Sequence, residues 1–141
     1  MIDNPARLKL KKYFQNQPVV LVYLFGSQAE GKTTPLSDYD FAVLFENNLS
    51  PKECFERKLE YITELGKILG TDKIEILKLN TAPANFRYSA FAPRQEIYVR
   101  DEGKRIDFEQ KTMAEYFDRL YYLRRHSLNS LKTIAKEGFG L

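Results

Sequence analysis

One stretch of the chain decides the fold: Phe25-Gly26-Ser27-Gln28-Ala29-Glu30-Gly31-Lys32-Thr33-Thr34-Pro35-Leu36-Ser37-Asp38-Tyr39-Asp40-Phe41-Ala42-Val43-Leu44-Phe45. An apolar run over residues 19–25 stops at a glycine and a serine, and a polar segment rich in turn-forming residues follows. An Asp-x-Asp sequence then leads into a second apolar run. This order predicts a strand, a turn and a second strand, with polar chemistry at the junction.

The two aspartates of this stretch are the first candidate ligands. Residues two apart in a strand project to the same face, so the carboxylates of Asp38 and Asp40 are expected to lie close together. Like charges at short range repel each other, and a cation between them relieves the repulsion. Mg²⁺ prefers oxygen ligands and is commonly held by one or two carboxylates together with substrate phosphates. The pattern therefore predicts a site for a metal-bound nucleotide.

The turn before the aspartates supplies the complementary half of such a site. A glycine after a strand lets the backbone approach a ligand closely, and the residues after it can offer free N–H groups to an anion. The hydroxyl of Ser27 adds a donor for a phosphate oxygen. We expect phosphate at Gly26 and Ser27, and metal at Asp38 and Asp40.

The pattern Gly-Ser, ten residues, then Asp-x-Asp resembles the signature of the polymerase-β-like nucleotidyltransferases, and the length of the chain resembles their minimal, single-domain members. The resemblance covers residues 17–100 in the order of its elements. It implies that Gly26 and Ser27 bind the triphosphate of ATP and that a later strand carries a third carboxylate, completing a site for two Mg²⁺ ions. The nucleotide-binding residues and the catalytic metal ligands are then these: Gly26, Ser27, Lys32 and Ser37 for the nucleotide, and Asp38, Asp40 and Glu75 for the metal.

Many minimal members of this family are antitoxins encoded beside a HEPN-domain toxin. They transfer AMP from ATP onto a tyrosine of that toxin. The resemblance therefore implies a Mg²⁺-dependent protein adenylyltransferase whose partner is a HEPN toxin.

The third carboxylate is assigned to Glu75, which lies between two isoleucines in an expected strand over residues 73–79. Minimal nucleotidyltransferases usually carry an aspartate there, in an apolar run that ends Leu-Asn, as Leu79-Asn80 does here. Glu75 matches by position and not by residue type. Asp72 at the strand entry is a rival, and a solvent-facing role for Glu75 is the structural alternative.

A second departure lies in the turn, where many relatives have a basic residue and this chain has Gln28 and Glu30. Lys32 is the substitute for that positive charge. Two further functions stay open beside the leading one. In the first, the chain has a weakened catalytic site and neutralises a toxin by binding to it. In the second, it is a nucleotidyltransferase with a small-molecule acceptor such as an aminoglycoside.

The order of the apolar runs predicts an α/β (α+β) domain over residues 1–141. The family resemblance implies that this domain has the polymerase-β-like nucleotidyltransferase fold, a small mixed sheet flanked by helices. Asn4 is expected to cap the first helix, and Phe55 and Leu59 are expected on the buried face of the second, with Ile62, Leu65, Ile68 and Leu69. The expected helices are 6–15, 51–69, 82–92 and 107–136. The expected strands are 19–25, 73–79, 95–100 and one that contains Asp38 and Asp40 and continues to Phe45.

The last helix carries a long apolar stripe with arginines alongside. Its first half can cover the sheet. Its second half is longer than a small domain needs, so a partner surface and core packing are both open. Arg87 and Arg94 are possible phosphate partners, and the only histidine, His126, is expected to be a surface or packing residue.

Composition excludes several classes of protein. The net charge of +3 is mild and spread along the chain, so no direct nucleic-acid binding is expected. A single cysteine, Cys54, leaves no intrachain disulfide and no cysteine metal cluster. Because no secretory segment or long apolar run is present, we expect a cytoplasmic protein without a membrane span.

Overall fold

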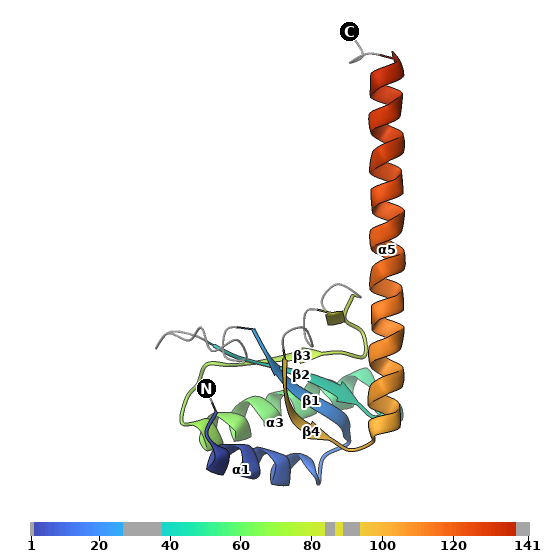
Figure 1. The fold of residues 1–141 in the computed structure, drawn as a ribbon. Helices are drawn as coiled ribbons and strands as arrows, with labels where there is room; N and C mark the ends of the chain where they lie inside the picture. The colour runs from blue at the N-terminus through green and yellow to red at the C-terminus, as the bar shows by residue number, and fades with distance from the viewer. Residues whose placement is uncertain (1, 27–37, 84–86, 89–93, 138–141) are drawn as a thin grey trace.

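The computed structural model describes residues 2–26, 38–83, 87–88 and 94–137. Within them, four strands form a sheet in the order β3-β2-β1-β4 (Figure 1). Two helices lie on one face of this sheet, and a long C-terminal helix rises from the other side. The elements are α1 (Asn4–Phe14), β1 (Val19–Phe25), β2 (Tyr39–Phe45), α3 (Pro51–Leu69), β3 (Ile74–Lys78), β4 (Arg94–Val99) and α5 (Glu102–Glu137).

The sheet is mixed, as predicted. β1 pairs antiparallel with both β2 and β4, whereas β2 and β3 run parallel, with α3 as their crossover. Residues 19–24 of the central strand β1 are buried, which agrees with the continuous apolar run in the sequence.

The core has two layers, one on each face of the sheet. On the first face Phe41, Val43 and Phe45 pack against α1 and α3. On the second face Ala42 and Leu44, the alternate residues of β2, belong to a cluster that includes Phe108 of α5. The alternation of β2 thus assigns even-numbered side chains to the α5 face.

Helix ends follow local side-chain chemistry. Ser50 caps α3 by accepting a hydrogen bond from the Glu53 N–H at 3.1 Å, and Gly70 ends the helix at φ +68°. At α1 the predicted cap was wrong by one residue. The carboxylate of Asp3 accepts from the Ala6 N–H at 2.8 Å, so Asn4 is already the first helical residue.

The buried face of α3 differs from the prediction. Phe55 and Leu59 are 59% and 51% exposed, while Cys54, Tyr61 and Leu65 are buried. Leu65 is buried as predicted, but the face that contacts the sheet is turned toward Cys54 and Tyr61 and away from Phe55 and Leu59. The partly buried Ile62, Ile68 and Leu69 still pack at the edge of the core.

Two helices predicted in the C-terminal half differ from the structure or are only partly described by it. α5 begins at Glu102 and not at Asp107, because the Asp101 carboxylate accepts from the Lys104 N–H at 3.1 Å and starts the helix one turn earlier. Of the helix predicted over 82–92, residues 87–88 are helical and most of the remainder lies outside the described residues.

A buried polar cluster attaches the base of α5 to the sheet. The hydroxyl of Tyr23 donates to Glu109 at 2.5 Å, and the same carboxylate accepts from Arg94 and Arg105 at 3.1 Å each. The Arg94 guanidinium also lies 5.0 Å from the centre of the Tyr23 ring. Burial and the neighbouring Glu109 carboxylate raise the pKa of Tyr23, so its phenol stays neutral and donates.

Beyond this cluster α5 leaves the domain. Thr112 is buried and Leu120 is half-buried, but the described side chains of residues 121–133 are all exposed. Core packing of the second half is therefore excluded for these residues. No helix in the described part of the chain is long and apolar enough to cross a membrane.

Replacing Glu109 with alanine tests the attachment of α5. The change leaves the Tyr23 hydroxyl and two guanidinium groups without their shared acceptor, so we expect a loss of about 2 kcal/mol in the free energy of unfolding. Chemical denaturation followed by circular dichroism measures it. Glu102→Ala is the control, because that side chain is 62% exposed and its ion pair with Arg105 contributes about 1 kcal/mol at most. Equal losses in the two variants would contradict this role for Glu109.

Candidate active site

The parallel pairing of β2 with β3 brings two of the predicted carboxylates together. Asp40 and Glu75 are direct partners in the register of the two strands. Asp38 lies just before β2, where the Tyr39 N–H donates to the Lys73 carbonyl at 2.9 Å. By the alternation of β2, Asp38 and Asp40 point to the same face as Ala42, which is the α5 face. Glu75 shares that face with Leu77 on β3.

The pKa of Asp40 reflects its burial and the nearby carboxylates of Glu75 and Asp38. Burial, the charges of Glu75 and Asp38, and a hydrogen bond with Glu75 together raise the pKa of Asp40 to about 6, and burial is the largest of these causes. Asp40 is half-buried, whereas Asp38 and Glu75 are exposed. The site is thus a crowded acidic cluster that opens to solvent on one side.

Gly26 closes the cluster from the neighbouring strand. Phe25 pairs with Asp40 across β1 and β2, so the next residue turns directly over the aspartate. Gly26 has φ +74°, and a Cβ atom at this position would lie 2.7 Å from Asp40 Oδ2. A side chain is therefore excluded here both by backbone conformation and by the aspartate. The predicted junction of turn and carboxylates is present in the structure.

The other predicted nucleotide contacts, Ser27, Lys32 and Ser37, lie outside the described residues, as do Gln28 and Glu30. Their roles stay predictions.

Of the two rivals for the third carboxylate, the geometry favours Glu75. Its charge and its hydrogen bond both act on Asp40. Asp72 precedes β3 and lines a shallow pocket at the end of α3, beside Gly66 and Gly70. The carboxylate that faces Asp40 is therefore the one on the strand.

The cluster has the donor chemistry that a hard cation requires. As they stand, no three acidic, histidine or cysteine side chains among the described residues are arranged to hold a metal ion. The raised pKa of Asp40 nevertheless records carboxylate repulsion that a bound divalent cation would relieve. Carboxylate oxygens are also the ligands that Mg²⁺ prefers. Asp38, Asp40 and Glu75 fit that ion by type and by face.

The two arginines suggested as phosphate partners are engaged elsewhere. Arg87 forms an ion pair with Glu115, and Arg94 pairs with Glu109 and Glu96. Both thus help to hold α5. No sequence pattern indicated Glu109 as the centre of this cluster, because an acid four residues after Arg105 is typical of an ordinary exposed helix pair.

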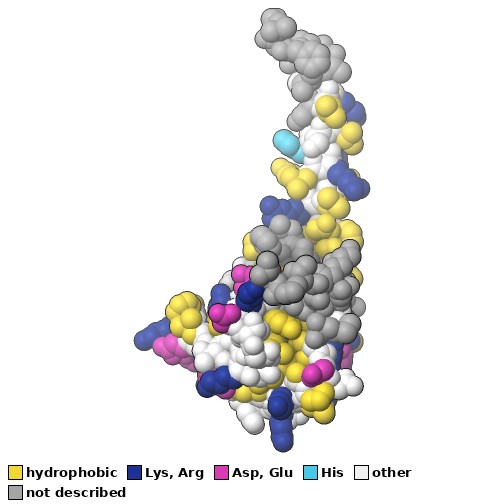
Figure 2. All heavy atoms as spheres, turned by 90° about the vertical axis from the view of Figure 1, so that its left-hand side faces the viewer, with side chains coloured by type: hydrophobic (Ala, Val, Ile, Leu, Met, Phe, Trp, Pro, Cys, Tyr) yellow, Lys and Arg dark blue, Asp and Glu magenta, His cyan; other side chains and the backbone are white. Residues whose placement is uncertain are grey.

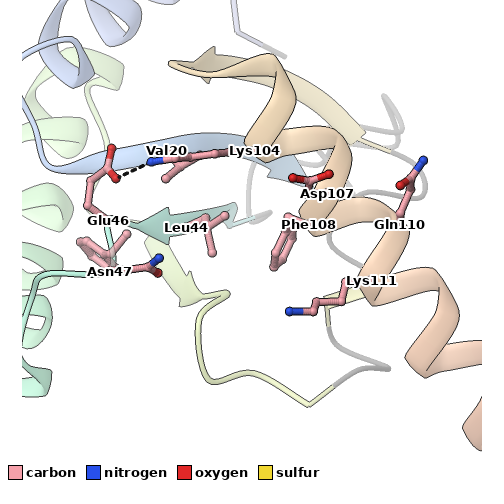
Figure 3. A pocket seen from close by; sticks show the side chains of 10 residues that line it. Val20, Leu44, Glu46, Asn47, Lys104, Asp107, Phe108, Gln110 and Lys111 are labelled. Carbon is pink, nitrogen blue, oxygen red and sulfur yellow. Dashed lines mark hydrogen bonds and ion pairs between the residues drawn. The ribbon is translucent and has the colours of Figure 1, made fainter.

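A pocket of about 680 Å³ lies at the opposite end of the strands, between the end of β2 and the base of α5 (Figure 3). Val20, Leu44 and Phe108 form its apolar walls, and Lys104 at its rim donates to Glu46 at 3.4 Å. Leu44 lies four residues after Asp40 on β2, or roughly 13 Å along the strand from the acidic cluster. The pocket is therefore separate from the acidic cluster.

Comparison with known proteins agrees with this geometry. The family model described as "Polymerase beta, Nucleotidyltransferase" matches residues 8–103. The chain belongs to this nucleotidyltransferase family. No curated protein matches the chain.

Solved structures share the fold across nearly the whole chain. A toxin–antitoxin crystal structure with AMP-PNP contains a chain with 21% identity and a TM-score of 0.67, covering 93% of this chain and 99% of that one. A complex of tri-AMPylated Shewanella oneidensis HEPN toxin with MNT antitoxin gives 19% identity and a TM-score of 0.65, with the same coverage. A chain of the MntA–HepT toxin–antitoxin structure gives 20% identity and a TM-score of 0.64, covering 92% of this chain and 99% of that one.

Asp40→Asn is expected to stabilise the protein in the absence of metal. An unfolded aspartate titrates near 4, and Asp40 in the fold titrates at about 6. Its contribution to stability is therefore complete below about pH 4 and is lost as the pH rises through about 6. Asparagine carries no charge at any pH, so at pH 7.5 in EDTA the variant should melt a few degrees higher than the unaltered protein.

Thermal unfolding between pH 4 and 8 measures this effect. Asp72→Asn is the matched control and should leave the melting temperature unchanged, because Asp72 lies outside the cluster. A melting temperature for Asp40→Asn at or below that of the unaltered protein would contradict the crowding of the carboxylates.

Proposed function

We propose that this chain transfers AMP from ATP onto a tyrosine hydroxyl of a HEPN-domain toxin and so neutralises it. The observation that carries the proposal is the acidic cluster of Asp38, Asp40 and Glu75 with Gly26 turned over it. Membership of the nucleotidyltransferase family supports the reaction class. The structures with AMP-PNP and with an AMPylated HEPN toxin support the nucleotide and the acceptor.

In the proposed reaction the tyrosine oxygen attacks the α-phosphorus of ATP. A new P–O bond joins AMP to the tyrosine, the bond to the β-phosphate breaks, and pyrophosphate leaves. Mg²⁺ held by Asp38, Asp40 and Glu75 would neutralise phosphate charge at the reacting centre. The hydroxyl proton must leave at the same time, and we assign its transfer to a carboxylate of the cluster.

The remaining groups orient the nucleotide. The lack of a side chain at Gly26 lets a phosphate approach the backbone at the end of β1. We assign Ser27, Lys32 and Ser37 to the triphosphate, since Ser27 and Ser37 carry hydroxyl donors and Lys32 a positive charge. The α5 face of the sheet, where the carboxylates point, is the side from which the tyrosine would approach.

Intact-mass measurement tests the function. The purified chain is incubated with ATP, Mg²⁺ and the HEPN-domain protein encoded beside it, and the mass of that protein is followed. We expect a gain of one or more AMP units. With Asp38→Asn and Asp40→Asn combined, the rate should fall at least about 100-fold while circular dichroism shows an intact fold. Equal transfer by the double variant would refute the site.

The same assay distinguishes the other candidate functions. A stable complex with no mass gain in the presence of ATP and Mg²⁺ would indicate a protein that neutralises its partner by contact. AMP transfer to an aminoglycoside, with no transfer to the HEPN protein, would indicate a drug-modifying enzyme.

A single substitution tests the third carboxylate. Glu75→Gln keeps the size and polarity of the side chain but removes the charge beside Asp40, so AMP transfer should fall by about 10-fold or more. Asp72→Asn should change it less than about 2-fold. The reverse ranking in initial-rate measurements would move the third carboxylate to Asp72.

A further inference from the structure

The part of α5 beyond the domain, residues 121–137, is called the arm here. At about 1.5 Å per residue it extends roughly 25 Å beyond the last half-buried residue of the helix, Leu120. Figure 1 shows it rising on the side of the sheet opposite α1 and α3. This is the α5 face, to which the acidic cluster also points. A protein bound to the arm would therefore stand over the face that carries the carboxylates.

The arm and the last turn before it carry an unbalanced charge. Residues 102–118 contain five acidic and three basic side chains, whereas residues 119–137 contain five basic side chains and one acidic one, the terminal Glu137. The arginines that are described here are exposed, and hydrophobic and basic side chains alternate along the arm (Figure 2). The basic residues of this stretch are Arg119, Arg124, Arg125, Lys132 and Lys136.

Leucines form a row along the same helix. Leu128 and Leu131 are 58% and 61% exposed and, with Leu123, Arg124 and Ser127, line a shallow groove of about 400 Å³. Phe117 lies on the same side of the helix and is 52% exposed. An apolar row of this length beside arginines has the composition of a protein interface core with a charged rim.

The charge decides what kind of occupant fits. Two arms packed side by side would bring the same basic residues together, which costs free energy, so a second copy is a poor partner for this surface. A partner with an apolar groove bordered by Asp and Glu satisfies both the leucines and the arginines.

We infer that the arm docks through Leu128 and Leu131, together with Phe117 one turn before it, in an apolar groove with an acidic rim on the protein that this chain modifies. This inference rests on the proposed function, because it takes the docked protein to be the AMP acceptor. Docking on the arm holds the acceptor on the α5 face, and this raises its effective concentration at the carboxylates.

A pair of double variants tests the docking. Leu128→Glu with Leu131→Glu places two charges in the apolar row. Asn129→Glu with Thr133→Glu places the same two charges on the other side of the helix, where both residues are exposed. All four positions lie outside the core, so both variants should keep the melting temperature and ATP affinity of the unaltered chain.

Affinity for the HEPN-domain protein is measured by calorimetry with the full-length chains. The leucine variant should bind at least about 100-fold more weakly and the control variant within about 3-fold of the unaltered chain. An acidic rim further predicts that binding of the unaltered chain weakens as salt rises from about 0.05 to 0.5 M.

The outcomes separate the inference from the function. Equal binding by the leucine variant and the unaltered chain overturns the docking inference and leaves AMP transfer untouched. Binding through the leucine row without any AMP gain supports docking and overturns the proposed function. No complex at all with the unaltered chain overturns both. The leucine variant could instead lose self-dimerisation, or binding to anionic phospholipid vesicles, that the unaltered chain and the control variant both show. Either result would assign the arm to another occupant and overturn the inference.

Discussion

The candidate site depends on the crowding of carboxylates where β2 and β3 pair in parallel. Asp40 and Glu75 are direct register partners, and burial together with these neighbours raises the pKa of Asp40 to about 6. Such an arrangement is unfavourable for the fold alone, since uncharged residues would pair there at lower cost. Gly26, which leaves no room for a side chain above Asp40, adds a second local constraint. The proposed site for a cation and phosphate would account for both.

The layering of the domain places this cluster on an accessible face. α1 and α3 bury one side of the sheet, so the alternation of β2 leaves its aspartates on the other. There the cover is the base of α5, attached through Glu109 to Tyr23, Arg94 and Arg105. Beyond this attachment α5 extends away from the sheet. The face that carries the carboxylates and the projecting helix therefore lie on one side of the molecule.

Sequence reasoning was most accurate where structure is local. The bounds of β1 and α3, the stop at Gly70 and the turn at Gly26 follow from apolar runs, caps and glycine, which act within a few residues. The prediction was wrong where several residues could start a helix, since Asp3 and Asp101 accept the capping hydrogen bonds and the helices begin earlier than expected. It was also wrong for the buried face of α3, because the rotation that exposes Phe55 and Leu59 depends on the sheet against which the helix packs. The Glu109 cluster joins three elements, so no short pattern could indicate it. Glu75 could be placed because strand order follows from the family resemblance.

The most direct test of this account is the pKa of Asp40 itself, measured by carboxyl NMR titration of the labelled protein with and without Mg²⁺ and assigned with Asp40→Asn. The account predicts a pKa near 6 without metal, as burial and the neighbouring carboxylates require. In saturating Mg²⁺ it predicts a fall to about 4 or below, because the ion favours the charged form. A pKa near 4 in both conditions would contradict the crowding. A pKa near 6 that Mg²⁺ does not move would contradict the metal site.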